Sequence, residues 1–327
     1  MSEVRSLPES QFNLVFPCIA DLPRPAGVIK TKEEDFFVEE VMNPELSGEG
    51  EHVWLWLEKN GQNTEYVAGQ LARFSHVKKV DVGLSGLKDR WALTRQWFSV
   101  YLGNKPEPNW NEFECEGVKV LSYQRHNKKL RRGEHSANFF RLVVRNIDNM
   151  ANVEALLLQV RDKGFPNYFG PQRFGFDGAN LDRGVQYFEG KIKASKSQRS
   201  FYLSAARSYL YNLNLASLIE SGDDLSADLS GPLYGDETPG SNELTEPEKE
   251  ILEAHPAFKK GIHQNRLRLE RRPYLVVPEA MSWSMGEAEL ELEFQLPTGV
   301  FATSLLAEVF NLSQGLGEGN QGMRSTR

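Results

Sequence analysis

The stretch EHVWLWLE, residues 51–58, indicates the fold class, because its apolar valine and leucines alternate with two tryptophans. This two-residue period is that of a β-strand, whose successive side chains point to opposite faces. The stretches TRQWFSVY (94–101) and NFFRLVVR (138–145) are similarly rich in β-branched and aromatic residues. Three such segments within the first 150 residues predict an extended sheet.

Helical patterns interrupt these strands. Residues 63–75 repeat apolar side chains at helical spacing, and Asn63 or Thr64 is a suitable N-terminal cap. A second helix is expected at 151–163, with Gly164 as its C-terminal stop, and a long amphipathic helix at 200–221. Strands and helices mixed in this way predict an α+β protein.

The rest of the chain is less regular. The strict alternation at 288–296 predicts another strand, and a last helix is expected after Gly299. The segment PNYFGPQRFG (166–175) is too rich in glycine and proline for a regular element. Residues 223–250, which are acidic and rich in Gly, Pro and Ser, predict an irregular loop. The tail from 313 has little apolar content and is expected to be disordered.

Composition excludes several classes of protein. The 327 residues, 40% hydrophobic and 25% charged, are typical of a globular protein large enough for two domains. The sequence contains neither an apolar run of about 18 residues nor a signal-peptide pattern, so a cytoplasmic protein outside the membrane is expected. Its two cysteines, Cys18 and Cys115, form no C-x-x-C pair, which argues against a disulfide framework and a zinc site.

The net charge of −7 is unevenly distributed. Residues 220–253 hold eleven acids and one lysine, a local charge of −10, so the rest of the chain carries +3. The segment RHNKKLRRGEH (125–135), here called the basic segment, has five Lys or Arg residues and one acid. Such a segment is either a solvated loop or a contact for the phosphates of a nucleic acid.

The turn GLSGLKDR (83–90) is the most suggestive local feature, because its glycines permit a tight turn that presents Asp89 between Lys88 and Arg90. A carboxylate flanked by cations stays ionised and can act as a nucleophile or a base. Taken alone, the same pattern also fits an ordinary turn.

Five stretches together resemble the tRNA pseudouridine synthase D family. They occur in the family's order between about residues 27 and 310. The stretches are KTKEEDFFVEE (30–40), GLKDRWALTRQ (86–96), the span from RHNKKLRRG to NFFRLVVR (125–145), PNYFGPQRFG (166–175) and PTGVFATS (297–304).

The resemblance implies a fold and an activity. The implied fold is an α+β catalytic domain with a mixed, largely antiparallel sheet and flanking helices, interrupted by a smaller inserted α/β domain. The implied boundaries are 1–163 and 276–312 for the catalytic domain and 164–275 for the insertion, with 313–327 as a disordered tail. The implied activity is isomerisation of uridine at tRNA position 13. It needs no metal or organic cofactor, because reactant and product are isomers, and the expected form is a monomer without a protein partner.

The resemblance also implies roles for single residues. Asp89 corresponds to the aspartate that opens the bond between base and ribose, and Lys30 to the basic residue that pairs with it and favours its ionised form. Asn138 corresponds to a polar substrate contact and Phe140 to the ring that stacks on the target base. Two further residues, Phe36 and Phe301, correspond to substrate-site aromatics.

Target uridines must be extruded from the RNA fold, so phosphate contacts are needed in addition to stacking. In this reading the basic segment binds the RNA backbone through Arg125, Lys128, Lys129, Arg131 and Arg132.

Other interpretations compete with these roles. The three phenylalanines are equally compatible with the hydrophobic core, Lys30 with the surface, and Asn138 with a strand start. A module that binds RNA without reacting is the main rival function. A metal-dependent nuclease is less compatible, because the sequence has no Asp, Glu or His cluster at ligand spacing. Only the spatial arrangement around Asp89 distinguishes these readings.

Overall fold

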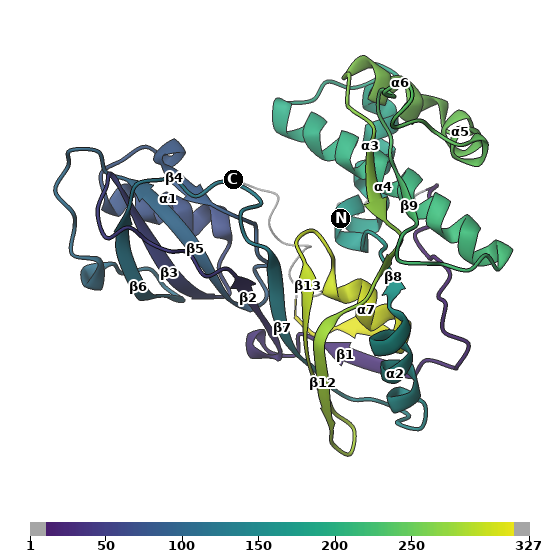
Figure 1. The fold of residues 1–327 in the computed structure, drawn as a ribbon, viewed down its shortest axis with the longest axis horizontal. Coiled ribbons are helices and arrows are strands. Elements are labelled where there is room, and N and C mark those ends of the chain that lie inside the picture. The colour runs from purple at the N-terminus through teal and green to yellow at the C-terminus, as the bar shows by residue number, and fades with distance from the viewer. Residues whose placement is uncertain (1–10, 317–327) are drawn as a thin grey trace, which may run out of the picture. The chain divides into compact units, whose positions relative to one another are not determined.

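The computed structural model describes residues 11–316, which form two compact units (Figure 1). The first, here called the sheet unit, contains residues 23–155, 278–299 and 309–316. The second, the helical unit, contains 11–22, 156–277 and 300–308. The predicted boundaries assign 11–22, 156–163, 276–277 and 300–308 to the catalytic domain, whereas these residues pack with the helical unit.

The sheet unit is built on one eight-stranded sheet. Seven strands follow the order β12, β13, β7, β2, β5, β3, β6, and β4 pairs with β5. Only the β2–β5 pairing is parallel, so the sheet is mixed and largely antiparallel, as expected. The strands are β2 (Phe36–Val41), β3 (His52–Asn60), β4 (Val82–Leu84), β5 (Leu93–Tyr101), β6 (Val118–His126), β7 (Ala137–Val144), β12 (Glu279–Met285) and β13 (Leu290–Pro297).

Helix α1 (Thr64–Phe74) lies beside β4 and β5 (Figure 1). Asn63 caps it as predicted, because its side chain accepts a hydrogen bond from the Glu65 backbone N–H. The apolar side of α1, with Val67 and Leu71, packs with residues of β3 and β5 in one hydrophobic core. Trp54, on the other face of β3 from Val53 and Leu55, is also buried, because its ring packs against His126 and its indole N–H donates to the Lys128 carbonyl.

A two-stranded parallel pairing completes the sheet unit. Strand β1 (Ala26–Ile29) pairs with β14 (Asn311–Gln314). The predicted disorder from 313 is therefore wrong for 313–316, because β14 finds backbone partners in β1 and the Leu316 N–H donates to the Lys30 carbonyl. The rest of that tail lies outside the described residues. Three single-turn helices also occur, η1 (Glu33–Asp35), η2 (Lys79–Asp81) and η3 (Trp110–Glu112).

The helical unit is arranged around α4 (Lys196–Ser221), which α3, α5 and α6 contact. This helix begins before the predicted residue 200, because Ser195 and Gln198 form a capping box, and it ends at Gly222 in the left-handed conformation. The other elements are α2 (Val153–Lys163), β8 (Phe165–Pro166), η4 (Pro171–Phe174), η5 (Phe176–Gly178), α3 (Ala179–Phe188), β9 (Ser230–Leu233), α5 (Glu246–Glu253), α6 (Pro256–Gln264), β10 (Glu270–Pro273), β11 (Leu275–Val276) and α7 (Ala302–Val309).

The acidic segment 223–250 is not the irregular loop that its composition predicts. It holds β9, which pairs with β10, and the start of α5. The segment becomes ordered because Tyr234 is buried and donates to the Glu248 carbonyl, and because Arg271 binds the Glu248 carboxylate. Long-range pairing of this kind leaves no periodic signal within the segment itself.

Candidate active site

Lys30 and Asp89, which are 59 positions apart in the chain, form an ion pair. Lys30 follows β1, and its side chain is almost completely buried, so the alternative of a surface lysine is wrong. Its backbone adopts the left-handed conformation (φ 56°), which costs a non-glycine residue free energy and tends to occur at functional sites. The backbone bond from Leu316 to the Lys30 carbonyl helps to hold this conformation.

The Asp89 carboxylate stays accessible while its backbone is anchored. Its side chain is 23% exposed, against 2% for Lys30. The buried ammonium of Lys59, on β3, donates to the Asp89 carbonyl at 2.8 Å and to the Gln62 carbonyl at 2.9 Å. The Trp91 N–H donates to Asp89 Oδ1 at 3.1 Å. The turn therefore presents an oriented carboxylate.

Buried polar groups hold the remainder of the turn. Gln96 donates to the Gly86 carbonyl at 3.0 Å, and the Lys88 N–H donates to Thr64 Oγ1 at 3.1 Å. The Lys88 ammonium binds Glu40 Oε1 at 2.8 Å, with both side chains shielded from solvent. Sequence analysis missed these supports. Their only signal was polar residues in strands, which does not distinguish a buried partner from an exposed face.

His135 joins the same network from the end of the basic segment. Its Nδ1 lies 2.5 Å from Ser85 Oγ and 3.9 Å from Glu40 Oε1. Burial and the nearby charge of Lys88 lower the pKa of His135 to about 4, so the ring is neutral at pH 7. Burial likewise lowers the pKa of Lys59 to about 8 and raises the pKa of Glu40 above its usual value.

Aromatic rings adjoin the ion pair. The Lys30 ammonium lies 4.5 Å from the centroid of the Phe36 ring, and Phe36 meets Phe140 edge to face at 6.4 Å. Phe140 also stacks against Phe294 at 5.3 Å. Both Phe36 and Phe140 are mostly buried. A place in the hydrophobic core is therefore compatible with a position beside the ion pair.

Asn138 lies on the same face of the sheet as Phe140, two residues away on β7. The residues directly opposite Asn138 on the two neighbouring strands are Glu40 on β2 and Leu296 on β13. Asn138 is 8% exposed, and its Oδ1 is buried with no hydrogen-bond donor among the described residues. A buried acceptor left open in this way is uncommon and fits a group that a ligand satisfies.

Phe301 belongs to the helical unit and is half-buried there. It packs against Phe169 with ring centroids 6.0 Å apart. Its place relative to Asp89 stays a prediction. The other implied substrate-site residues, by contrast, lie together in the sheet unit.

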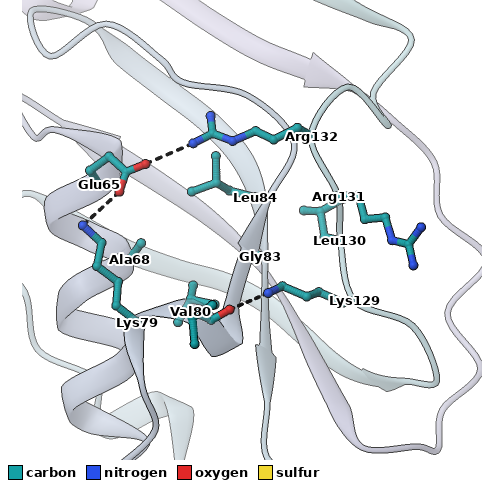
Figure 2. Close-up of a pocket in the computed structure, with 11 residues that line it drawn as sticks. Glu65, Ala68, Lys79, Val80, Gly83, Leu84, Lys129, Leu130, Arg131 and Arg132 are labelled. Atoms are coloured by element: carbon teal, nitrogen blue, oxygen red, sulfur yellow. Dashed lines mark hydrogen bonds and ion pairs between the residues drawn. The ribbon is translucent and has the colours of Figure 1, made fainter. Parts of the chain in front are cut away.

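The basic segment spans the end of β6 and the loop that follows. Part of it lines a pocket of about 590 Å³ together with Glu65, Lys79 and Val80 (Figure 2). Figure 2 shows Arg132 bound to Glu65, which also binds Lys79, and Lys129 bound to the Val80 carbonyl. Arg125 pairs with Glu107. The remaining two cations, Lys128 and Arg131, are exposed.

The described residues contain neither a membrane-spanning helix nor a metal-binding cluster. No helix within 11–316 combines the length and apolar character that crossing a bilayer requires. Within the same range, no three His, Cys, Asp or Glu side chains gather in a group suited to a metal ion. Neither Cys18 nor Cys115 forms a disulfide in this part of the chain.

Comparisons with known proteins agree on one family. The model of "tRNA pseudouridine synthase D (TruD)" matches residues 16–182. A tRNA pseudouridine synthase D from Cellvibrio japonicus is 41% identical, with 93% of this chain and 95% of that protein covered. The same-named protein from Hydrogenovibrio crunogenus is 36% identical, with 89% and 94% covered.

A solved structure confirms the α+β pseudouridine synthase fold. It is a crystal structure assigned as tRNA pseudouridine synthase D from Methanosarcina mazei, with a TM-score of 0.67 and 21% identity. The similarity covers 91% of this chain and 96% of that one. The chain therefore belongs to the tRNA pseudouridine synthase D family, and so to the isomerases that act on tRNA uridines.

Proposed function

We propose that this protein isomerises uridine 13 of tRNA to pseudouridine and that Asp89 is its catalytic carboxylate. The observation that carries the proposal is the Lys30–Asp89 ion pair beside Phe36 and Phe140, with the carboxylate partly open to solvent. An RNA-binding module without activity has no use for a carboxylate at a phosphate-rich surface, because like charges repel. The geometry therefore favours the enzyme over the rival binding module.

Each residue has a role that follows from its contacts. Lys30 orients Asp89 and favours its ionised form, because an ammonium beside a carboxylate stabilises the negative charge. Phe36 and Phe140 offer faces or edges for an extruded base, and stacking contributes about 1–3 kcal/mol per base. The open Oδ1 of Asn138 accepts a hydrogen bond from an imide N–H such as uracil N3–H.

The chemistry is an internal rearrangement. The bond between ribose C1′ and uracil N1 breaks, the detached base turns, and C5 bonds to C1′ while the C5 proton is released and N1 regains one. No electron is gained or lost overall, which supports a reaction without a redox cofactor. Phosphate contacts from the basic segment help to offset the few kcal/mol that extruding a base costs.

The organisation of the chain is part of the proposal. The helical unit corresponds to the inserted domain, and the sheet unit to the catalytic domain. Lys30, Asp89, Phe36, Asn138 and Phe140 all come from one chain, which supports a monomer as the active species. A protein acting on tRNA is expected in the cytoplasm.

The decisive experiment replaces Asp89. We expect Asp89→Asn to abolish pseudouridine formation in a tRNA transcript while tRNA affinity is retained, because the amide keeps the shape of the side chain and loses its charge and nucleophilicity. Position 13 is identified by mapping pseudouridine in the product, and the assay contains EDTA. The matched control is Asp162→Asn, which alters an exposed aspartate. Undiminished conversion by Asp89→Asn would contradict the assignment.

A further inference from the structure

Arg173 lies in the helical unit, on the single turn η4, and its guanidinium faces two adjoining aromatic rings. Its guanidinium carbon is 5.5 Å from the centroid of Phe169 and 5.8 Å from that of Phe301. Nη1 donates to Ser204 Oγ at 3.1 Å. Nε is buried and has no acceptor among the described residues. The side chain is thus fixed in place while part of its donor capacity is unused.

Among the described residues, the positive charge of Arg173 has no carboxylate beside it, in contrast to the charges of two other arginines of the helical unit. Within residues 11–316 no ion pair joins Arg173 to a carboxylate, whereas Arg271 binds Glu248 and Arg207 lies 3.5 Å from Glu270. Burial lowers the pKa of the Arg173 guanidinium from its usual value, although the group stays charged at neutral pH. A half-buried cation without an anion is costly unless a ligand supplies the charge.

A second guanidinium stands over the same ring. The Arg272 guanidinium carbon lies 4.2 Å from the centroid of Phe169. Burial is the main cause that lowers the pKa of Arg272, and the positive charge of Arg173 adds to it. Two cations that repel each other beside one phenylalanine make a local excess of positive charge in a protein whose net charge is −7.

We propose that Arg173, assisted by Arg272, binds a phosphodiester of the substrate RNA next to Phe301. The inference rests on the proposed function, since that function supplies the RNA. A guanidinium presents paired N–H donors whose spacing matches two phosphate oxygens, and its flat face stacks on an aromatic ring at the same time. The adjoining half-buried Phe301 gives a neighbouring base a ring to stack on.

The test measures tRNA binding across a range of salt concentrations. We expect Arg173→Met to weaken affinity about ten- to a hundredfold. We also expect the slope of log K against log salt to become shallower by about 0.7–0.9, the loss of one phosphate contact. Arg173→Lys should keep the salt slope of the wild type and recover part of the affinity. Lysine keeps the positive charge but lacks the paired N–H donors of the guanidinium. The control Arg183→Met removes an equal charge from an exposed position on α3.

A second probe locates the phosphate and does not depend on the folding of Arg173→Met. Transcripts carrying one neutral methylphosphonate at successive positions around the target uridine are bound by the wild type, Arg173→Met and Arg173→Lys. One position should weaken binding clearly for the wild type, less for Arg173→Lys, which keeps the charge, and least for Arg173→Met, which has lost it. Equal losses for all three proteins at every position, or an unchanged salt slope, would overturn the inference. Conversion by the wild type, measured in parallel, reports separately on the proposed function.

Discussion

Lys59 shows how one buried side chain serves a site that it does not enter. The residue is 1% exposed, and its ammonium donates to the carbonyls of Asp89 and Gln62. Burial lowers its pKa to about 8. Keeping the buried ammonium charged therefore costs free energy, which the two carbonyls and the negative charge of Asp89 only partly offset. We infer that Lys59 is a positioning residue for the Asp89 backbone.

Replacing Lys59 with Met is expected to lower kcat about ten- to a hundredfold with little change in KM. The Asp89 carbonyl loses its donor, the turn shifts, and small misplacements of reacting groups have effects of this size. Single-turnover rates and the pH profile of kcat provide the measurement, with Lys119→Met on the neighbouring strand β6 as the control. A purely structural role would lower the free energy of unfolding and leave the rate constant of folded enzyme unchanged.

His135 links stability to pH. Its pKa is about 4 in the folded protein and about 6.5 when unfolded, so the unfolded chain binds more protons between these values. The free energy of unfolding is therefore expected to fall as pH decreases from 6.5 to 4, by at most about 3 kcal/mol from this residue. Glu40, whose pKa is raised, acts in the opposite direction, and burial lowers the pKa of Lys88, which faces both groups.

The comparison of wild type with His135→Gln isolates this effect. The variant should be less stable than the wild type at pH 7, and the difference should shrink towards pH 4. Urea unfolding at several pH values measures it, and His76→Asn, at an exposed position, is the control. A constant difference across the range would show that protonation of His135 is not responsible.

At the scale of elements, the structure refines the predicted RNA contacts of the basic segment most. Arg132 and Lys129 already have partners in Glu65 and the Val80 carbonyl, while Lys128 and Arg131 are exposed and form no ion pair within 11–316. RNA phosphates that bind Arg132 must compete with Glu65. Lys128 and Arg131 are therefore expected to contribute more per residue.

Two pairs of substitutions test this order. Replacing Lys128 and Arg131 with Ala should weaken tRNA affinity and reduce the salt slope by about 1.4–1.8, that is, by two phosphate contacts. Replacing Lys129 and Arg132 should have a smaller effect on the slope. Salt-dependent binding measures both, with Lys105 and Lys119 replaced together as a control. If neither pair changes the slope, the segment is a solvated loop.

The pairing of β1 with β14 is an element-scale device that positions Lys30. Strand β14 comes from the far end of the described chain and runs parallel to β1. An added Cβ at Gly315 would lie 2.9 Å from Thr31 Cα and 3.1 Å from the Lys30 carbonyl oxygen, so only glycine fits this close approach without a shift. The C-terminal strand thereby contributes to the geometry of the ion pair.

On the scale of the whole molecule, charge is divided by region. The eleven acids of 220–253 lie in the helical unit, while the basic segment and the Lys30–Asp89 pair lie in the sheet unit. Arg173 and Arg272 show that the helical unit also carries positive charge at a specific place. A total of −7 is therefore compatible with an RNA substrate, because phosphates meet local charge and not the sum.

The sequence by itself determined the strands and helices whose periodic faces are buried, such as β3, α1 and β13, and the family motifs that surround Asp89. It could not reveal the order in 223–250, the pairing of β14, or the supports of the turn that carries Asp89. Lys59, Glu40 and Gln96 read as polar strand residues, and their value depends on partners tens of positions away. Only the tertiary structure decided these features, because desolvation and hydrogen bonding act between groups that folding brings together.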